Sequence, residues 1–359
     1  MSQEFGIVYS PEYANVLNPP NHPLQGTRYL KSIEFFKNVG IWGHPNIKLI
    51  DPEPATNAEI LLAHKKDHLH RVQKLSELGK GRFDHDTPVY KGIYETAISA
   101  TGGSLTAMRF VLAEAVECAM NLSGGFHHAT PTQARGYCIF NDINIIGTIL
   151  LNEGIQRVLY VEIDAHFGDG TYFFFKNNSQ FFTLSFHESG ASLYPYSDDQ
   201  FFGEGEGYGY HLNVPLPIWT DDDAFLYAFN SIFLPVVSAY EPEFILFQCG
   251  VDGHCRDWQS HLLLTKTAYQ AVARTLRDIL DDTCPKKKLI VLGGGGYDPQ
   301  AASLSWAVVI NELAKLNLDL SSFDDDCEKE PYEDINAMEK IEQIVDELSP
   351  FLNPEKPKK

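Results

Sequence analysis

Short apolar runs recur along the chain, and most of them are rich in β-branched or aromatic residues. Runs without polar alternation are typical of strands that are buried on both faces of a parallel sheet. We therefore predict strands at these places: FGIVY (5–9), RVLYVEI (157–163), FFTLSF (181–186), FILFQC (244–249) and LIVLGGGG (289–296).

Amphipathic segments of helix length lie between these runs. They cover residues 99–120, 221–240 and 265–280, and an acidic DDD opens the second. Strands that alternate with helices predict an α/β fold with a mainly parallel central sheet flanked by helices. Ligands of such sheets bind at the edge where the carboxyl ends of the strands meet. The residues that follow each run are therefore candidates for a functional site.

The pattern changes near residue 324, where DDDCEKEPYED interrupts it. Beyond this segment, apolar residues repeat at helical spacing: Ile335, Met338, Ile341, Val345 and Leu348. We predict a single domain over residues 1–323, followed over residues 324–359 by an acidic connection and a helix that lies on the domain. A helix that binds a partner is the alternative.

Composition and charge narrow the possible partners. The chain has 359 residues, of which 44% are hydrophobic, so a large core can form. It carries 28 Lys and Arg residues against 48 Asp and Glu residues, for a formal net charge of -20. We expect no nucleic acid or membrane partner, because this charge weakens attraction to both. The charge would favour a cationic substrate, although solubility explains it more simply.

The cysteines and the N-terminus indicate the compartment. The six cysteines are scattered, without a CxxC pair or a dense framework, which favours a reducing environment. The opening MSQEFGIVYS lacks the basic and apolar regions of a secretion signal. No run approaches the roughly 18 apolar residues that a membrane span needs. We therefore expect a cytoplasmic protein.

Two strand ends carry residues that can bind a metal ion. DAHFGDG follows RVLYVEI and places Asp164 and His166 two residues apart, on the same side of an extended segment. GVDG follows FILFQC and presents Asp252 at the same edge. Two carboxylates and one imidazole suit Zn²⁺ or Fe²⁺ and leave a position for water and substrate. Asp252 alone could be a helix cap or turn residue, but the three together predict a metal site.

The segment GGFHHA places His127 and His128 together on a glycine-rich loop. Two imidazoles there can serve as the general base and the electrostatic partner of a water bound to the metal. Glu162 and Asp169 bracket the predicted ligand pair, and each can orient one imidazole. Surface or core histidines are the alternative, and the neighbouring metal site makes it less attractive.

The segment LGGGGY carries Tyr297 away from a strand end. A phosphate-binding loop is the alternative, but neither a GxGxxG pattern with a following acidic residue nor the Lys-Ser/Thr pair of a P-loop is present. A phenol held at this edge can donate a hydrogen bond to an oxyanion.

Six motifs, in this order, resemble those of histone deacetylases and related amidohydrolases. They are GGFHHA, GYCIFND, VEIDAHFGDG, TLSFHESG, GVDG and LGGGGY. The resemblance covers roughly residues 5–320 and is closest to the prokaryotic acetoin utilisation branch. That closeness depends on SFHESGASLYP, GEGEGYGYHLNVPL with the following TDDD, and GVDGHCRDWQSHLLLT.

The resemblance implies a single-domain fold of the arginase/deacetylase type, with Asp164, His166 and Asp252 as ligands of Zn²⁺. It implies hydrolysis of acetyl or short acyl amides, above all acetyl-lysine in proteins, by a water that the metal activates. In that chemistry His128 is the general base and later the acid, and His127 supports the charge. Tyr297 would polarise the acyl oxygen together with the metal.

Further positions follow from the resemblance alone. Gly136, Tyr137 and Tyr194 would line a narrow tunnel for the acyl-lysine. Asp86 would lie at the rim and hold the substrate backbone, and Arg28 would lie beneath the site. Potassium ions would bind at two places, one at Asp164, His166, Ser185 and Phe186, and the other near Phe175, Asn178, Phe181 and Tyr210.

Three positions depart from the family pattern. Glu162 stands where the family usually has Asp, so its contact with His127 must accommodate one more methylene. Phe167 replaces a histidine whose side chain points away from the ligands. DWQS after Asp252 lacks the usual DPLG or DPLT turn, which affects the rim of the pocket.

Two other functions are alternatives, and a third is disfavoured. An acetylpolyamine substrate is the first alternative, and the acidic surface favours it. A protein that binds acylated lysine without hydrolysing it is the second. An arginase-like hydrolase of guanidines is disfavoured, because Phe167-Gly168 stands where a further bridging Asp would follow the histidine.

Overall fold

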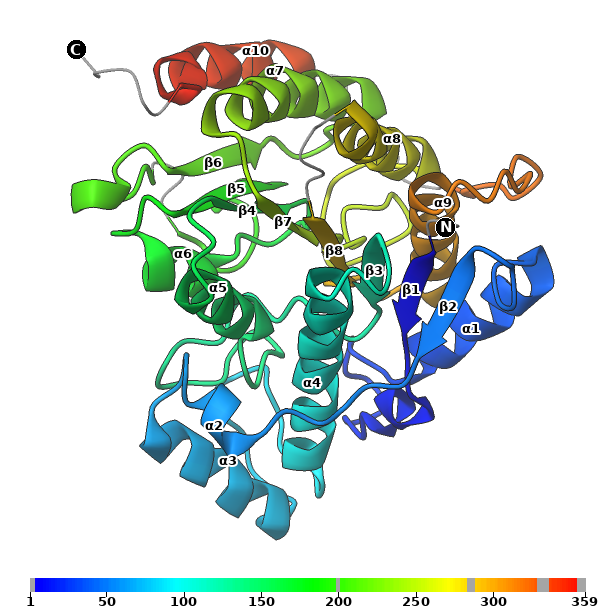
Figure 1. Ribbon diagram of the computed structural model, residues 1–359, viewed down its shortest axis with the longest axis vertical. Coiled ribbons are helices and arrows are strands. Elements are labelled where there is room, and N and C mark those ends of the chain that lie inside the picture. Colours follow the sequence, from blue (N-terminus) through cyan, green and yellow to red (C-terminus); the bar gives the residue numbers. More distant parts are fainter. Residues whose placement is uncertain (1–3, 198–200, 283–287, 328–335, 354–359) are drawn as a thin grey trace.

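A computed structural model describes residues 4–197, 201–282, 288–327 and 336–353 of the chain. Its centre is an eight-stranded sheet in the order β2-β1-β3-β8-β7-β4-β5-β6 (Figure 1). All neighbouring strands are parallel. The strands are β1 (Phe5–Val8), β2 (Ile47–Ile50), β3 (Cys118–Asn121), β4 (Val158–Glu162), β5 (Phe181–Glu188), β6 (His211–Leu216), β7 (Phe244–Gln248) and β8 (Lys288–Leu292). The predicted α/β fold is confirmed.

Helices cover both faces of this sheet (Figure 1). They are α1 (Thr27–Val39), α2 (Asn57–Ile60), α3 (Lys66–Leu78), α4 (Ile93–Leu112), α5 (Asp142–Asn152), α6 (Asp169–Phe175), α7 (Asp222–Tyr240), α8 (Lys266–Asp282), α9 (Pro299–Leu313) and α10 (Ala337–Leu348). One buried apolar cluster joins the sheet to α1, α7, α8 and α9, and a second joins it to α3, α4 and α5.

The apolar runs in the sequence follow from this double coverage. Successive side chains of a strand point to opposite faces of the sheet. In β7, Phe244 and Leu246 enter the cluster under α4, whereas Ile245 and Phe247 enter the cluster under α7 and α8. A strand covered on both faces therefore shows no polar alternation.

Part of the predicted pattern is wrong at the start of the sheet. The helix expected over residues 99–120 is α4 (Ile93–Leu112), and its predicted end is instead β3 (Cys118–Asn121). Alanine and methionine favour helices, but pairing with β1 on one side and β8 on the other makes this segment a strand. β2 and β6 were not predicted, because neither forms a run that is apolar throughout.

The C-terminal segment is attached to the rest of the chain. Figure 1 shows α10 alongside α7, and Ile341 and Leu348 are buried in the cluster that contains α7. The predicted helix is confirmed there, whereas Ile335 lies outside the described residues. The division of the chain at residue 323 remains a proposal.

A disulfide bond, which the cysteine spacing did not predict, joins Cys255 to Cys327. Their Cα atoms lie 5.5 Å apart and they are separated by 72 residues in the sequence. Beside the bond, Asp325 accepts a hydrogen bond at 2.8 Å from the Lys266 amide, and its Oδ1 lies 3.0 Å from His254 Nε2. The acidic connection is thereby fixed to the loop after β7. Within the described residues, no helix is long and apolar enough to span a membrane.

Candidate active site

The ends of β4 and β7 bring the predicted metal ligands together. The two strands are neighbours, with Glu162 opposite Gln248 at their carboxyl ends. The next residues of each strand lead into the loops that carry Asp164 and His166 on one side and Asp252 on the other. One potential ligand atom from each of these three residues lies within 4.8 Å of the others, and all three residues are buried.

The facing atoms of this triad are two carboxylate oxygens and one imidazole nitrogen. His166 Nδ1 lies 2.8 Å from Asp252 Oδ2 and 3.3 Å from Asp164 Oδ1. Backbone and side-chain amides hold the other two oxygens: Ala165 N donates to Asp252 Oδ1 at 2.8 Å, and Gln248 Nε2 donates to Asp164 Oδ2 at 2.7 Å. Asp164 Oδ1 also accepts the His166 amide at 3.0 Å, and this oxygen, Asp252 Oδ2 and His166 Nδ1 face one another around the place for a shared ligand.

A glycine permits the close packing around these carboxylates. A Cβ on Gly295 would lie 2.3 Å from Asp252 Oδ2 and 3.0 Å from Asp164 Oδ2. The Gly295 amide instead donates to Asp164 Oδ2 at 2.8 Å. Two buried carboxylates and one imidazole are a donor set that Zn²⁺ and Fe²⁺ accept, and a divalent cation would offset the repulsion between the carboxylates. The residues present fit such an ion.

Each of the paired histidines has its own carboxylate. His127 Nδ1 lies 2.8 Å from Glu162 Oε2, and His128 Nδ1 lies 2.9 Å from Asp169 Oδ1. The two ring centroids are 4.1 Å apart. These contacts direct Nδ1 of each imidazole to a carboxylate and leave Nε2 on the side of the metal ligands.

The two imidazoles have different pKa values because the groups around each of them differ. Burial lowers the pKa of His127, but Asp164 and Glu162 outweigh it and raise this pKa to about 9. Burial and the neighbouring His127 lower the pKa of His128 to about 4, although Asp169 opposes this shift. Near neutral pH, His127 is thus suited to carry positive charge and His128 to accept a proton.

The structure accommodates the longer side chain of Glu162. Its Oε1 accepts the Gly168 amide at 2.8 Å, and the Tyr160 hydroxyl donates to its Oε2. A Cβ on Gly168 would lie only 2.5 Å from either oxygen of Glu162. The extra methylene therefore occupies space that the missing side chain at residue 168 leaves open.

Most of the remaining predicted residues lie around one pocket that ends at the metal ligands. Its lining contains both histidines, Asp164 and His166, together with Gly136, Tyr137, Tyr194, Asp86, Arg28 and Tyr297. Arg28 is buried and donates to the Gly296 carbonyl at 2.9 Å and to the Tyr29 hydroxyl at 2.8 Å. The structure thus brings these residues together, and their individual roles stay predictions.

The DWQS segment connects the metal loop to Tyr297. Asp257 Oδ2 accepts the Tyr297 amide at 2.5 Å, and Ser260 Oγ donates to the Asp252 carbonyl at 2.6 Å. Gln259 lines the pocket, while Trp258 is exposed beside it. The DWQS segment therefore contributes Gln259 to the pocket lining and holds the backbones of Asp252 and Tyr297 through two different side chains, Ser260 and Asp257.

Comparison with known proteins agrees with this geometry. The histone deacetylase domain matches residues 22–313. The chain belongs to the histone deacetylase family.

Two curated bacterial proteins illustrate the similarity. Acetoin utilization protein AcuC of Bacillus subtilis (strain 168) is 35% identical over 328 residues, which cover 89% of this chain and 82% of that protein. Acetoin utilization protein AcuC of Staphylococcus xylosus is 32% identical over 326 residues, covering 87% of this chain and 84% of that protein. The predicted family is confirmed.

Two solved structures have the same fold. The HD domain of HDA15 superposes with a TM-score of 0.82 at 23% identity and covers 98% of this chain and 97% of its own. An HDAC homolog complexed with SAHA gives 0.81 at 27% identity, covering 96% and 99%. The eight-stranded parallel sheet is therefore that of histone deacetylase structures.

The predicted potassium positions fall into two groups. Ser185 lies opposite Glu162 in the register of β4 and β5, so Ser185 and Phe186 lie beside the start of the metal loop. In the other group, the rings of Phe175 and Phe181 stack 3.7 Å apart, and the Asn178 carbonyl lies 3.2 Å from His211 Nε2. Tyr210 accepts the Thr183 amide through its carbonyl at 3.0 Å. Potassium binding at both groups stays a prediction.

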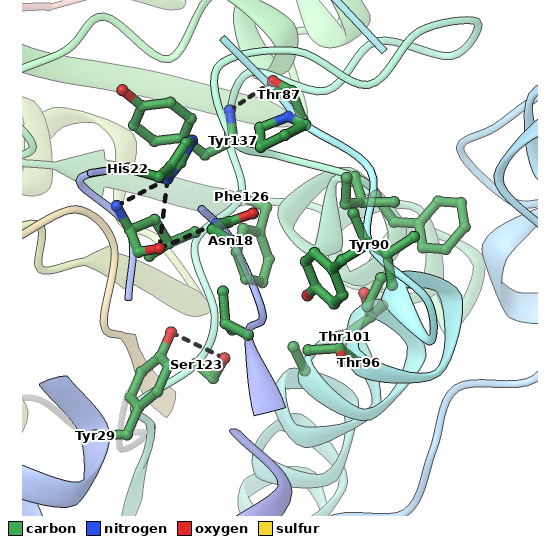
Figure 2. A pocket seen from close by; sticks show the side chains of 18 residues that line it. Asn18, His22, Tyr29, Thr87, Tyr90, Thr96, Thr101, Ser123, Phe126 and Tyr137 are labelled. Carbon is green, nitrogen blue, oxygen red and sulfur yellow. Dashed lines mark hydrogen bonds between the residues drawn. The ribbon is translucent and has the colours of Figure 1, made fainter. Parts of the chain in front are cut away.

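A second cavity lies behind the wall of the active-site pocket (Figure 2). Leu24, Phe126 and Tyr137 line both cavities. The labelled side chains in Figure 2 come from four parts of the chain: the segment before α1, α1 itself, the stretch that leads into and includes the first half of α4, and the loop between β3 and α5. Tyr29 and Ser123 close one end, with their hydroxyls 3.0 Å apart. Phe126 and Tyr137 thus lie at the boundary of the two spaces.

Sequence reasoning missed several residues that support the site, and three of them contact predicted site residues through their side chains. Gln248 holds Asp164, Asp257 holds the Tyr297 backbone, and Arg135 contacts Asp169. Gln248 had a signal, because it is a polar residue in an otherwise apolar strand. Arg135 had none, since its contacts join segments that are distant in the sequence.

His64 supports the histidine loop from the opposite side. It is 3% exposed, its Nε2 accepts the Asn141 amide at 2.9 Å, and its Nδ1 lies 3.0 Å from the Thr130 carbonyl. Asn141 Nδ2 in turn donates to the His127 carbonyl at 3.1 Å. This arrangement requires a neutral imidazole, because protonated Nε2 would oppose the Asn141 amide.

We expect His64 to make folding stability depend on pH. Burial is the main cause that lowers its pKa from 6.5 to about 3. The unfolded chain binds the proton first, so stability is complete above pH 6.5 and is lost as the pH falls toward 3. At pH 5 the loss from this group should be about 2 kcal/mol.

The measurement compares urea unfolding of wild type and His64→Gln at pH 7 and pH 5. Glutamine can accept the Asn141 amide and does not titrate. The fall in unfolding free energy between the two pH values should be smaller in the variant. Equal falls in both proteins would contradict the assignment.

Proposed function

We propose that the protein hydrolyses acetyl or other short acyl amides, with acylated lysine side chains of proteins as the main substrate class and a bound divalent cation as cofactor. The proposal depends on one observation: a pocket ends at a buried Asp/His/Asp triad, beside two carboxylate-paired histidines and a tyrosine. These are the groups that amide hydrolysis requires.

The divalent cation, when bound, would supply Lewis acidity to the acyl oxygen and lower the pKa of water toward about 7. In this proposal, His128 takes the proton from the attacking water; the contact of its Nδ1 with Asp169, which leaves Nε2 available, supports this role. The same imidazole can return the proton to the departing lysine amine. His127, held by Glu162 in a buried position, supplies positive charge.

In this proposal, Tyr297 donates its hydroxyl hydrogen to the oxyanion that forms at the acyl oxygen when water attacks the acyl carbon. Burial is the main cause that raises its phenol pKa well above the usual value, so the hydroxyl keeps its proton. Tyr137 packs against it with ring centroids 5.8 Å apart. Both rings line the pocket, and in this proposal the acylated lysine side chain passes beside them.

An acylated polyamine is the second candidate substrate. The side chains of Asp84 and Asp86 lie near the pocket rim, Asp86 in its lining, and the formal net charge of the chain is -20. Negative charge at the entrance would attract the remaining amines of such a substrate. A peptide whose acylated lysine has acidic neighbours would be disfavoured by the same charge.

The deciding experiment measures acid release from acyl-lysine peptides and from acetylspermidine. The protein is assayed as purified, after chelation, and after reloading with Zn²⁺ or Fe²⁺. We expect hydrolysis that chelation removes and metal restores, with a higher kcat/KM for the peptides. Preference for acetylspermidine would select the second candidate. If the protein bound one metal ion and an acyl-lysine peptide but released no acid, it would be a protein that binds acylated lysine without hydrolysing it.

A further inference from the structure

Arg135 lies between Asp169, the carboxylate that contacts His128, and Tyr194, which lines the pocket. One terminal nitrogen of its guanidinium is 2.8 Å from Asp169 Oδ2, and its Nε donates to the Tyr194 hydroxyl at 3.0 Å. Its side chain is 24% exposed, whereas that of Asp169 is 4% exposed. A single guanidinium therefore contacts two segments that form the site.

Asp169 uses both of its oxygens in this arrangement. Oδ1 lies 2.9 Å from His128 Nδ1, and Oδ2 is the atom that Arg135 contacts. A carboxylate held at one oxygen can still rotate about its last bond, but one held at both oxygens cannot. The direction of the His128 ring therefore depends on both partners of Asp169.

Tyr194 connects the same arginine to His128 by a second route. The ring of Tyr194 packs edge-on against His128, with centroids 5.0 Å apart and an interplanar angle of 82°. The Arg135 guanidinium carbon lies 5.6 Å from the centroid of the Tyr194 ring. Since Tyr194 lines the pocket, its position affects both the imidazole and the space available to a substrate.

The backbone fixes Arg135 at the base of a tight turn. Arg135 N donates to the Cys138 carbonyl at 3.0 Å, and Cys138 N donates to the Arg135 carbonyl at 2.9 Å. The turn between them consists of Gly136 and Tyr137, which both have positive φ, 53° and 64°. The backbone of Arg135 is thus fixed at the start of a segment whose Gly136 and Tyr137 line the pocket.

We propose that Arg135 is a positioning residue for the amide hydrolysis proposed above, on which this inference rests. It holds Asp169, and through it His128, in the orientation for proton transfer, and it holds Tyr194 against the same imidazole. A planar guanidinium suits this task because its nitrogens can donate in two fixed directions at once. Arg135 is not itself part of the pocket lining.

The test compares Arg135→Gln, Arg135→Lys and Arg109→Gln. Glutamine removes both the positive charge and the planar set of N–H donors of the guanidinium, while lysine keeps one charged donor group. Arg109 is the matched control, because it also pairs with a carboxylate, Glu59, and does not line the pocket. We expect kcat of Arg135→Gln to fall about 10- to 100-fold, as is typical for residues that orient an active-site histidine. KM should change less than kcat.

Arg135→Lys should recover at least part of the lost kcat, because its ammonium can still reach Asp169. Arg109→Gln should keep the wild-type kcat and KM. If Arg135→Gln matched Arg109→Gln, or if lysine recovered nothing over glutamine, the positioning role would be wrong.

A second readout does not depend on hydrolysis. The zinc-loaded protein should show a low-field ¹H NMR signal from the His128 Nδ1 proton, which Asp169→Asn identifies by removing it. Arg135→Gln should shift or broaden this signal, and Arg109→Gln should leave it unchanged. An inactive wild type would contradict the proposed function, while the NMR signal would still decide whether Arg135 orients the pair; an unchanged signal in Arg135→Gln would refute that.

Discussion

Asp252→Asn should abolish metal-dependent hydrolysis. The carboxylate is completely buried, and its Oδ2 faces His166 Nδ1 at 2.8 Å. An amide is a much weaker ligand than a carboxylate, so both metal affinity and activity should fall by more than about 100-fold. Mutation of residues that only hydrogen-bond to metal ligands already causes losses of up to about 100-fold. The measurements are bound zinc per chain by elemental analysis, and acid release from acyl-lysine peptides.

The fold should survive this change, because removal of one buried negative charge relieves repulsion with Asp164. Thermal unfolding of the metal-free variant should therefore be no easier than that of the metal-free wild type. Asp319→Asn, at an exposed carboxylate, is the control. One equivalent of tightly bound zinc and normal turnover in Asp252→Asn would remove this residue from the metal site.

Tyr297→Phe should retain the fold and lose about 10² to 10³ in kcat, the usual cost of one oxyanion donor. The substitution deletes only the hydroxyl. The backbone is held independently by Asp257, whose Oδ2 accepts the Tyr297 amide, so the loop should not move. The measurements are kcat with an acyl-lysine peptide and the melting temperature.

Tyr227→Phe is the matched control, since Tyr227 is 41% exposed and lies on α7, outside the pocket lining. Its kcat and melting temperature should equal those of wild type. Wild-type turnover in Tyr297→Phe would mean that another group stabilises the oxyanion.

The metal triad could be predicted because it follows from rules that act along the chain. Strands buried on both faces are visible as apolar runs, and their carboxyl ends meet at one edge of a parallel sheet. Asp164, His166 and Asp252 each follow such a run. The shared edge could be predicted from these runs, whereas the convergence within 4.8 Å also requires β4 and β7 to be neighbours, which the sequence does not state.

Other features depend on pairings that a single sequence does not contain. β3 has helix-favouring residues and becomes a strand only because β1 and β8 flank it. Arg135 reaches Asp169 and Tyr194 across loops that follow different elements. The contact of Asp257 with the Tyr297 amide likewise joins two loops, and nothing in DWQS alone predicts it.

The bond between Cys255 and Cys327 closes a ring of chain that contains α8, β8, Tyr297 and α9 and begins three residues after Asp252. A ring of this size lowers the entropy of the unfolded chain by an amount worth about 4 kcal/mol. Reduction of this bond would give a second covalent form, with free thiols at Cys255 and Cys327. Preparations made with and without a thiol reductant would contain different covalent forms. An activity or melting temperature measured for one form would therefore not apply to the other.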